Sequence, residues 1–357
     1  LAVLLLALDP SSFHYASVVL TDTPFTLLLL LSVLLLTPAS GDTDAVPHAL
    51  GGGLLLAVAT LFRPIAYYLI PVTALFAAIQ TWRKGTRAWL RPVATFLLFP
   101  LLLVGGWRLH NLQRTGSSAF SQSEAIELWM IRGLAVKARV DHLPVWAEQR
   151  AEGWDEYLYR FGYVDSERAI FGEQRYSELF PRTARLTTTE LAREYREKGS
   201  RMLKDHPWLT LRMQVVGAVL LLFASPPLIW AYHYHFFKPD PAFERAYFAP
   251  DYGAMIELLR ASHPFLLALV LSCIVLLVGF YALVLRGLLR AGLRGKWRQQ
   301  LIPLGSLLYL IAVTSGPSAI DDRYRIPLMP LFCLYAGLGL VRAPKVSAAP
   351  DGSAPSA

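Results

Sequence analysis

Apolar residues in this chain gather into long continuous runs, separated by short polar stretches and one long polar segment. The runs cover residues 1–8, 24–37, 48–62, 65–80, 93–107, 209–225, 264–285, 301–315 and 326–341. A membrane-spanning helix needs about 20 mostly apolar residues, and several of these runs approach or reach that length. The pattern therefore predicts a mainly α, polytopic α-helical membrane protein.

The apolar stretch 48–80 predicts two helices rather than one. As a single helix it would extend for about 50 Å, whereas the hydrocarbon core of a bilayer is about 30 Å thick. Arg63-Pro64 interrupts it, and proline ends or kinks a helix while arginine prefers the membrane interface. We expect two short helices that meet at Arg63. Run 1–8 is too short for a span or a signal peptide, so we expect its helix to begin upstream of Leu1.

Composition and charge exclude two broad classes. Of the 357 residues, 54% are hydrophobic and 17% are charged, whereas a soluble domain carries about 25% charged residues. Neither an ordinary soluble domain nor a disordered chain fits. The net charge of +8 comes largely from 83–91 and 286–298, two stretches that contain no acid and adjoin apolar runs. Such loops mark the cytoplasmic side of a membrane. We expect no nucleic-acid partner, because no nucleic-acid-binding motif accompanies the charge.

The two basic stretches fix a topology. If both are cytoplasmic, Arg63-Pro64 and the polar segment 108–208 lie outside. Between 208 and 286 the chain must then cross an odd number of times, so 209–225 and 264–285 cannot both span. We predict that 209–225, which carries Arg212, is an interfacial or re-entrant helix on the outer face. The alternative is that it spans and the basic loop breaks the charge rule.

This topology divides the chain into four parts. Residues 1–107 form transmembrane helices, of which the first is partial, and 108–208 form an extracytoplasmic, largely helical domain. Residues 209–342 add the interfacial helix and the C-terminal spans, and 343–357 form a disordered cytoplasmic tail rich in Ala, Pro and Ser. A capping box from Thr187 to Glu190 is expected to start the last helix of the extracytoplasmic domain.

Two ionisable residues at helix ends are the first candidates for binding, because charged groups at membrane depth are costly. Asp22 stands where an apolar run begins, and it either faces an outer cavity as a carboxylate or caps its helix. Arg63 lies at the predicted helix break. Its guanidinium suits an anionic head group, and the alternative is an arginine whose charged end extends to the interface.

The densest polar cluster beside a span precedes the last apolar run. It comprises two carboxylates, two guanidiniums and a phenol, from Asp321, Asp322, Arg323, Tyr324 and Arg325. The arginines would clamp a lipid-linked phosphate, and the carboxylates would orient them or contact a sugar. The alternative is an interfacial anchor of aromatic and basic residues.

Other motifs favour structural roles. Gly51-Gly52-Gly53 fits close helix packing, since a phosphate loop would need a Lys or Ser/Thr at its end. His233 and His235 have no nearby acid or cysteine at ligand spacing, so aromatic packing is expected and no metal site is assigned. Cys273 and Cys333 both lie in apolar runs and are expected to pack in the core.

Several segments, taken in order, resemble the bacterial GT-C fold glycosyltransferases that use polyprenyl-phosphate sugars, including the protein mannosyltransferase-like and aminoarabinose transferase-like families. They are "DPSSFHYASVVLTDTPFTLLLLL", "GGGLLLAVATLFRPIAYYLIP", "WRLHNLQRTGSSAFS", "DHPWLTL…LFASP" and "DDRYRIPLMPLFCLYAGLGL". Each is moderately specific, and together they extend over nearly the whole chain.

The resemblance implies a multi-pass enzyme of the bacterial inner membrane. It would transfer a sugar from a polyprenyl phosphate to a glycan, lipid or protein acceptor on the outer face. No bound cofactor is implied, and divalent-metal dependence stays open. The family's catalytic base follows the first span, so it is expected upstream of Leu1. Asp22 instead matches a later acidic position at a helix start. His110 departs from the arginine that relatives often carry there, and Arg108 is the candidate substitute. The alternative classes are a flippase for lipid-linked glycans and a noncatalytic membrane scaffold.

Overall fold

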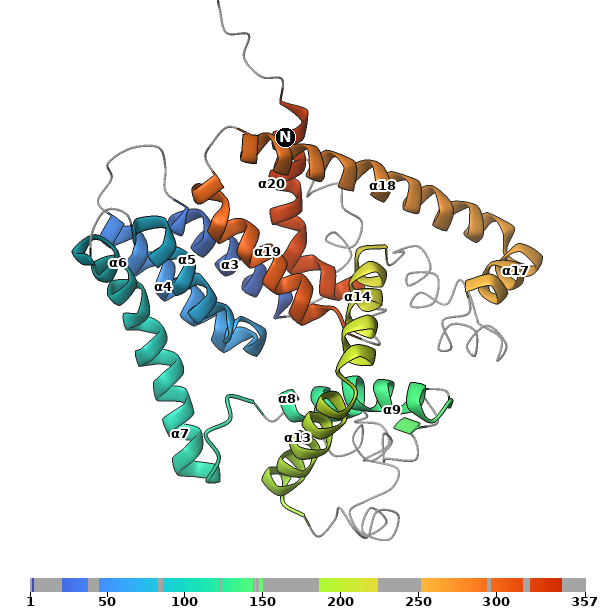
Figure 1. Ribbon diagram of the computed structural model, residues 1–357, viewed down its shortest axis with the longest axis horizontal. Helices are drawn as coiled ribbons and strands as arrows, with labels where there is room; N and C mark the ends of the chain where they lie inside the picture. The colour runs from blue at the N-terminus through green and yellow to red at the C-terminus, as the bar shows by residue number, and fades with distance from the viewer. Residues whose placement is uncertain are drawn as a thin grey trace, which may run out of the picture.

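The computed structural model describes residues 2, 21–37, 45–82, 86–121, 123–143, 145, 148–149, 186–223, 252–293, 297–316 and 322–341. Every secondary-structure element in these ranges is a helix, which confirms the predicted mainly α class (Figure 1). Asp321, the two histidines at 233 and 235, and the tail 343–357 lie outside the described residues.

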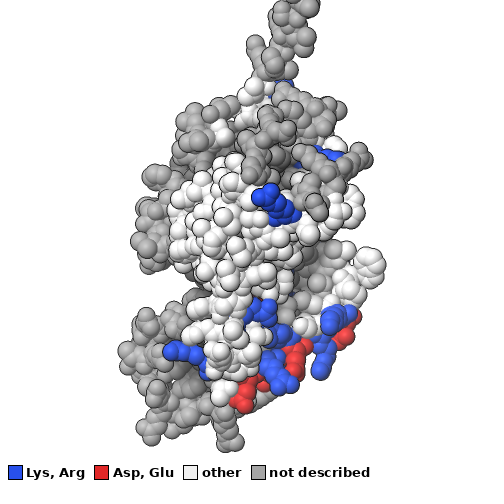
Figure 2. All heavy atoms as spheres, turned by 90° about the vertical axis from the view of Figure 1, so that its left-hand side faces the viewer, with Lys and Arg blue, Asp and Glu red and all other residues white. Residues whose placement is uncertain are grey.

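Three of the described helices are long and apolar enough to cross a membrane: Pro64–Thr81, Trp89–Thr115 and Pro264–Gly292. A fourth is reached if the bent pair Thr189–Asp205 and Pro207–Phe223 counts as one span. The face seen in Figure 2 has a broad surface almost without charged side chains among the described residues, and basic and acidic side chains gather below it. An apolar band next to a charged end is the surface expected of a membrane protein.

The first described helices form a hairpin. α3 (Asp22–Leu36) packs antiparallel against α4 (Ala45–Phe62), and the hydroxyl of Ser32 donates to the carbonyl of Gly52 at 2.8 Å. A methyl group at Gly52 would overlap the side chain of Leu36, and one at Gly53 would overlap the backbone carbonyl of α6. The glycines thus let α4 approach helices on two sides, which confirms the predicted packing role.

The chain breaks after α4 as predicted. Arg63 adopts an extended backbone with φ −141° and ψ 116°, because a residue before proline is sterically excluded from the helical region. A short 3-10 turn, η1 (Pro64–Ala66), then leads into α5 (Leu69–Thr81), which ends at Trp82. We name the two ends of the helical bundle the Arg63 end and the Trp82 end.

The next helix is longer than the apolar run 93–107 indicates. α6 (Thr86–Phe99), a π-helical segment η3 (Pro100–Val104) and α7 (Gly105–Thr115) follow one another without a break. Gly116 ends the helix in the left-handed conformation with φ 70°, which glycine adopts without strain. The polar residues of α7 continue the helix past the apolar run, so α7 extends beyond the bundle at the Arg63 end (Figure 1).

The C-terminal helices cross one another closely. α18 (Pro264–Leu293) meets α20 (Met329–Leu340) where Gly287 lies against Tyr335 and Gly339. The predicted span ended at residue 285, but α18 continues to Leu293 and so takes in the first basic residues of stretch 286–298. Arg290 explains the extension, because its guanidinium donates to the carbonyls of Gly339 at 2.7 Å and Val341 at 2.6 Å at the end of α20.

The remaining bundle helices connect the two ends. η5 (Trp297–Gln300) lies at the Trp82 end, where the amide of Gln80 donates to the Arg298 carbonyl at 2.8 Å. From there α19 (Leu301–Thr314) runs to the Arg63 end. After a gap, η6 (Asp322–Leu328) leads into α20, which returns.

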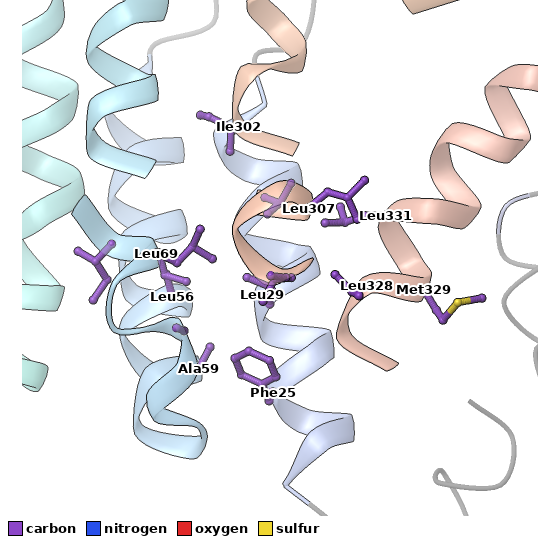
Figure 3. Close-up of a cluster of buried hydrophobic side chains, with 14 of the residues drawn as sticks. Phe25, Leu29, Leu56, Ala59, Leu69, Ile302, Leu307, Leu328, Met329 and Leu331 are labelled. Carbon is purple, nitrogen blue, oxygen red and sulfur yellow. The ribbon is translucent and has the colours of Figure 1, made fainter. Parts of the chain in front are cut away.

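One hydrophobic core joins these helices. Side chains of α3, α4, α5, α19 and α20 point toward one another in Figure 3, among them Phe25, Leu29, Leu56, Ala59, Leu69, Ile302, Leu307 and Leu331. Cys333 belongs to this core, as predicted, whereas Cys273 on α18 is only half-buried and lies outside it; both are free thiols.

A second, smaller core lies in the segment 108–208. α8 (Ser123–Ile126), the π-helical η4 (Glu127–Gly133) and α9 (Leu134–Val140) pack against α13 (Thr188–Asp205) around Trp129 and Tyr195. The capping box is present: Thr187 accepts from the backbone of Glu190, whose carboxylate accepts from the Thr187 backbone at 2.7 Å. These parts of the segment are helical, as predicted.

α14 (Pro207–Phe223) follows α13 at a bend of 99°. It passes beside the end of α19, where Gly217 lies against Gly316 and Gln214 donates to the Ser315 hydroxyl at 2.7 Å. Its last turn reaches α18, since the Tyr281 hydroxyl donates to the carbonyl of Leu222 at 2.8 Å. The helix α17 (Tyr252–Ser262) precedes α18.

Candidate functional site

The structure joins the two ionisable residues that the sequence singles out at helix ends. Asp22 is the first residue of α3 and Arg63 follows the last residue of α4, and the guanidinium of Arg63 forms an ion pair with the Asp22 carboxylate. Arg63 Nε also donates to the Thr21 hydroxyl at 3.3 Å. The Asp22 side chain is 1% exposed and that of Arg63 is 22% exposed. The acid is therefore enclosed, whereas the base keeps an exposed side.

Asp22 does not occupy the N-cap position of α3, which was the structural alternative to a binding role. The N-cap of α3 is Thr21, which makes no side-chain capping bond, and Asp22 stands one residue inside the helix. Its charge is favourable in the first turn because the N-terminus of a helix carries partial positive charge. Its carboxylate nevertheless turns to Arg63, so its main contact is across the hairpin.

A second guanidinium lies at the same end of the bundle. Arg108, on α7, donates to the Tyr67 hydroxyl at 2.6 Å and to the Ser118 carbonyl at 2.8 Å, and it lies 5.5 Å from the centre of the Tyr67 ring. Tyr67 follows η1 within a turn of Arg63. The helix break thus contains Arg63, and Tyr67 just after it contacts Arg108.

The loop after α7 is fixed by the same helix. Trp107 donates its indole N–H to the Phe120 carbonyl at 3.2 Å, and the Asn111 amide donates to the Ala119 carbonyl at 3.1 Å. These bonds set the path of residues 116–121 and so the position of α8. The described residues 116–121 are therefore held against α7.

Glu124 lies on α8, the helix that follows this loop. It is half-buried on α8, and burial raises its pKa. The neighbouring charge of Arg196 opposes the rise, Glu127 adds to it, and Arg108 opposes it. Tyr68 and Tyr309 also lie within the electrostatic reach of Glu124. A carboxyl with a raised pKa beside two arginines is a candidate for binding or proton exchange.

We expect the Glu124→Gln variant to become more stable than the parent as pH rises. The folded state raises the pKa above its unfolded value, so the stability contributed by the neutral carboxyl is present at low pH and is lost as pH rises through the folded pKa. The melting temperature of the solubilised protein measured from pH 4 to pH 8 tests this expectation. Near pH 4, the two proteins should have equal melting temperatures.

The exposed neighbour Glu127 provides the matched control for this experiment. Glu127→Gln removes one neighbouring negative charge and keeps the buried carboxyl, so its melting temperature should fall with rising pH as that of the parent does. A parent that stays as stable as Glu124→Gln at pH 8 would contradict the assignment of burial as the cause of the shift.

The cluster before the last helix is placed in part. Asp322, Arg323 and Tyr324 belong to η6, for which the structure describes the backbone of these three residues, and Asp321 lies outside the described residues. Arg325 is fully buried, and it donates to the Leu222 carbonyl at 3.1 Å. This bond satisfies a carbonyl at the end of α14 and joins that helix to η6, directly before α20. Phosphate binding by the cluster stays a prediction.

The sequence analysis missed Glu124, Tyr67 and Tyr68. Glu124 is one of many charged residues in the polar segment 108–208, so nothing in the sequence distinguishes it from the others. The tyrosine pair was hidden in an apolar run, although two adjacent tyrosines one turn after Arg63-Pro64 fit the aromatic residues that gather at a membrane interface. Arg108 was named only as a substitute for His110, and its bond to Tyr67 gives it a place at the site.

No group of three His, Cys, Asp or Glu side chains with metal-binding geometry occurs in the part of the chain that the structure describes. No family model, curated protein or solved structure matches this chain. The functional argument therefore depends on the site itself and on the resemblance of the ordered sequence segments.

Proposed function

We propose that this protein is an integral-membrane glycosyltransferase that transfers a sugar from a polyprenyl-phosphate donor to an acceptor on the extracytoplasmic face. The observation that carries the proposal is the Asp22–Arg63 ion pair, an enclosed carboxylate that fixes a partly exposed guanidinium at the end of the apolar bundle. The ordered resemblance to GT-C fold enzymes supplies the reaction.

The arrangement of the helices supports the proposed topology. Arg63, α8, α13 and the end of α19 lie at one end of the bundle, and Gln80, Arg298 and the end of α20 lie at the other. The second end adjoins both acid-free basic stretches. We infer that the Trp82 end faces the cytoplasm and that the Arg63 end faces outward.

Arg63 suits the phosphate of the donor. A guanidinium stays charged at any physiological pH and offers five N–H donors in a planar fork that matches phosphate oxygens. Two of these donors serve Thr21 and Asp22 in the structure. Asp22 thus orients the fork, and the exposed side of Arg63 faces the head-group region where a lipid-linked phosphate would lie.

The proposed chemistry is a single displacement. The acceptor oxygen forms a bond to the anomeric carbon and gives its proton to a base. The bond from that carbon to the phosphate oxygen breaks, and the electron pair leaves with the polyprenyl phosphate. This inverts the anomeric centre. Arg63 and Arg108 would stabilise the charge that develops on the leaving phosphate.

We expect Arg63→Gln to lower sugar transfer about 100-fold, the usual cost of removing one donor to a developing negative charge. The assay follows transfer of labelled sugar from polyprenyl-phosphate donors by the full chain in membrane vesicles. Because Arg63→Gln leaves Asp22 enclosed without its charged partner, the double variant Asp22→Asn with Arg63→Gln is measured beside it.

Arg114→Gln is the matched control, since Arg114 is an exposed arginine in the last turn of α7. It should retain parental transfer. Absence of transfer by the parent from every polyprenyl-phosphate sugar would overturn the proposal, and so would full activity of the double variant.

A further inference from the structure

A guanidinium at the Trp82 end of the bundle is not used by the chain itself. Arg298 belongs to the short turn η5, and its guanidinium lies 5.4 Å from the centre of the Trp297 ring. Arg63 and Arg290 donate to other parts of the chain, whereas nothing in the part of the chain that the structure describes accepts from the Arg298 guanidinium. The side chain is half-buried, and a charge removed from water is costly until an opposite charge meets it. Arg298 therefore suits an anion from outside the chain.

The backbone of Arg298 is held by the neighbouring helix. The amide of Gln80 donates to the Arg298 carbonyl at 2.8 Å, which ties the last turns of α5 to η5. On its other side η5 continues directly into α19, where Ile302 is buried in the main core. A residue fixed in this way needs little ordering when it binds a ligand. Because the bond uses only the carbonyl, the side chain can be replaced without removing it.

Exposed tryptophans place this arginine at the depth of the lipid head groups. Trp297 is 52% exposed and Trp82 is 65% exposed, and the Trp82 ring stacks on that of Trp89 with the ring centres 5.8 Å apart. Tryptophan gathers at membrane interfaces because its ring is apolar and its N–H is polar. Trp82 directly follows Thr81, the last residue of a helix that is long and apolar enough to span a membrane.

An exposed apolar stripe leads from this interface along α5. Leu75 and Ile79 are both exposed, and their spacing places them on one face of the helix with Trp82. An acyl chain can lie along such a stripe, whereas a water-borne anion gains nothing from it. The surface thus combines a guanidinium at head-group depth with apolar side chains at chain depth.

The net charge of this end selects among lipids. Residues 83–91 contain four basic residues and 286–298 contain five, without an acid in either stretch. The sequence between α3 and α4 adds two acids, Asp42 and Asp44, and leaves a large positive excess. An anionic lipid is attracted by this excess as well as by Arg298, because each basic residue near the surface contributes about 1 kcal/mol. A zwitterionic lipid has no net charge to match it.

We propose that Arg298 and Trp297 bind the head group of an anionic phospholipid at the Trp82 end. The guanidinium donates to the phosphate oxygens, the Trp297 ring lies beside the glycerol backbone, and the acyl chains extend along the exposed stripe of α5. The proposal requires a membrane protein but not a glycosyltransferase, so absence of sugar transfer would leave this site standing.

Native mass spectrometry of the full chain in a non-ionic detergent tests the site. The probes are phosphatidylglycerol and phosphatidylcholine with the same acyl chains. The parent should bind its first phosphatidylglycerol about tenfold more tightly than phosphatidylcholine. Arg298→Gln should weaken phosphatidylglycerol binding about tenfold, the effect of losing a hydrogen bond to a charged group. Trp297→Ala should weaken it too, because the guanidinium loses the ring beside it.

Arg286→Gln is the matched control, since it removes an exposed arginine of the same basic stretch. It should bind phosphatidylglycerol nearly as the parent does. Equal losses in Arg286→Gln and Arg298→Gln would show a diffuse effect of charge and overturn the site, and so would equal affinity of the parent for the two lipids. Parental binding by both Arg298→Gln and Trp297→Ala would overturn it as well.

Inorganic phosphate in excess distinguishes a lipid from a free anion. It should leave phosphatidylglycerol bound, because the acyl chains contribute to lipid binding and phosphate lacks them. Displacement of the lipid by phosphate would show that the site takes the anion alone and would overturn the lipid assignment. Equal melting temperatures of parent and variants in lipid-free detergent establish that losses of binding do not reflect unfolding.

Discussion

The Gly287→Ala variant is expected to lose about 3 kcal/mol of unfolding free energy, at the upper end of the usual cost of overpacking a close contact. A methyl group at Gly287 would overlap the carbonyl oxygen of Tyr335, a backbone atom that cannot rotate away. Gly339 faces the same crossing from α20 and approaches the carbonyl of Leu283. The two helices must therefore separate, and the packing along their crossing is lost.

The same helix contains the control. Gly279 on α18 has no atom of the described residues within 4 Å of an added methyl group. Gly279→Ala should be neutral or slightly stabilising, because alanine favours a helix over glycine by about 1 kcal/mol. Unfolding of the solubilised protein in increasing dodecyl sulfate compares the variants. Equal loss in the two variants would show that helix propensity, not the crossing, governs α18.

Asp22→Ala is expected to cost a similar amount, about 3 kcal/mol, because it leaves the Arg63 charge beside an enclosed apolar space. The carboxylate is 1% exposed, so water cannot replace it without opening the hairpin. Removal of one partner from a buried pair is more costly than the net worth of the pair, since the remaining charge keeps its desolvation cost.

A double-mutant cycle separates these contributions. Asp22→Ala combined with Arg63→Ala should cost less than the sum of the single variants. Asp141→Ala is the surface comparison, since Asp141 pairs with Lys137 at 2.9 Å and is 40% exposed. Such pairs contribute at most about 1 kcal/mol. Additive costs for Asp22 and Arg63 would show that the pair does not couple the two helices.

Much of the bundle was predictable because apolar runs, prolines and glycines act locally. The break at Arg63-Pro64 depends on a steric rule between neighbours, and the capping box at Thr187 depends on residues three apart. Helix ends were less predictable. α18 continues past its apolar run because Arg290 bonds to carbonyls at the end of α20, a contact between positions about 50 residues apart in sequence.

The candidate site was also predictable only in part. Asp22 and Arg63 were singled out because charged residues at the ends of apolar runs are conspicuous in a sequence. Their pairing depends on the antiparallel hairpin of α3 and α4, which no single run reveals. Glu124 gained its surroundings from α7 and α13, which approach it only in the folded chain, and its charged neighbours in sequence gave no reason to prefer it.

α13 and α14 meet near His206 at a bend of 99°, with α13 packed in the second core and α14 packed beside Gly316 at the end of α19. Arg196 lies about 15 Å from that bend along α13 at 1.5 Å per residue. If the bent pair tilts as one rigid body by about 10° in the plane of the bend, Arg196 moves by roughly 2.5 Å. Through such a tilt, a change in the orientation of α14 would be passed to the second core around Tyr195.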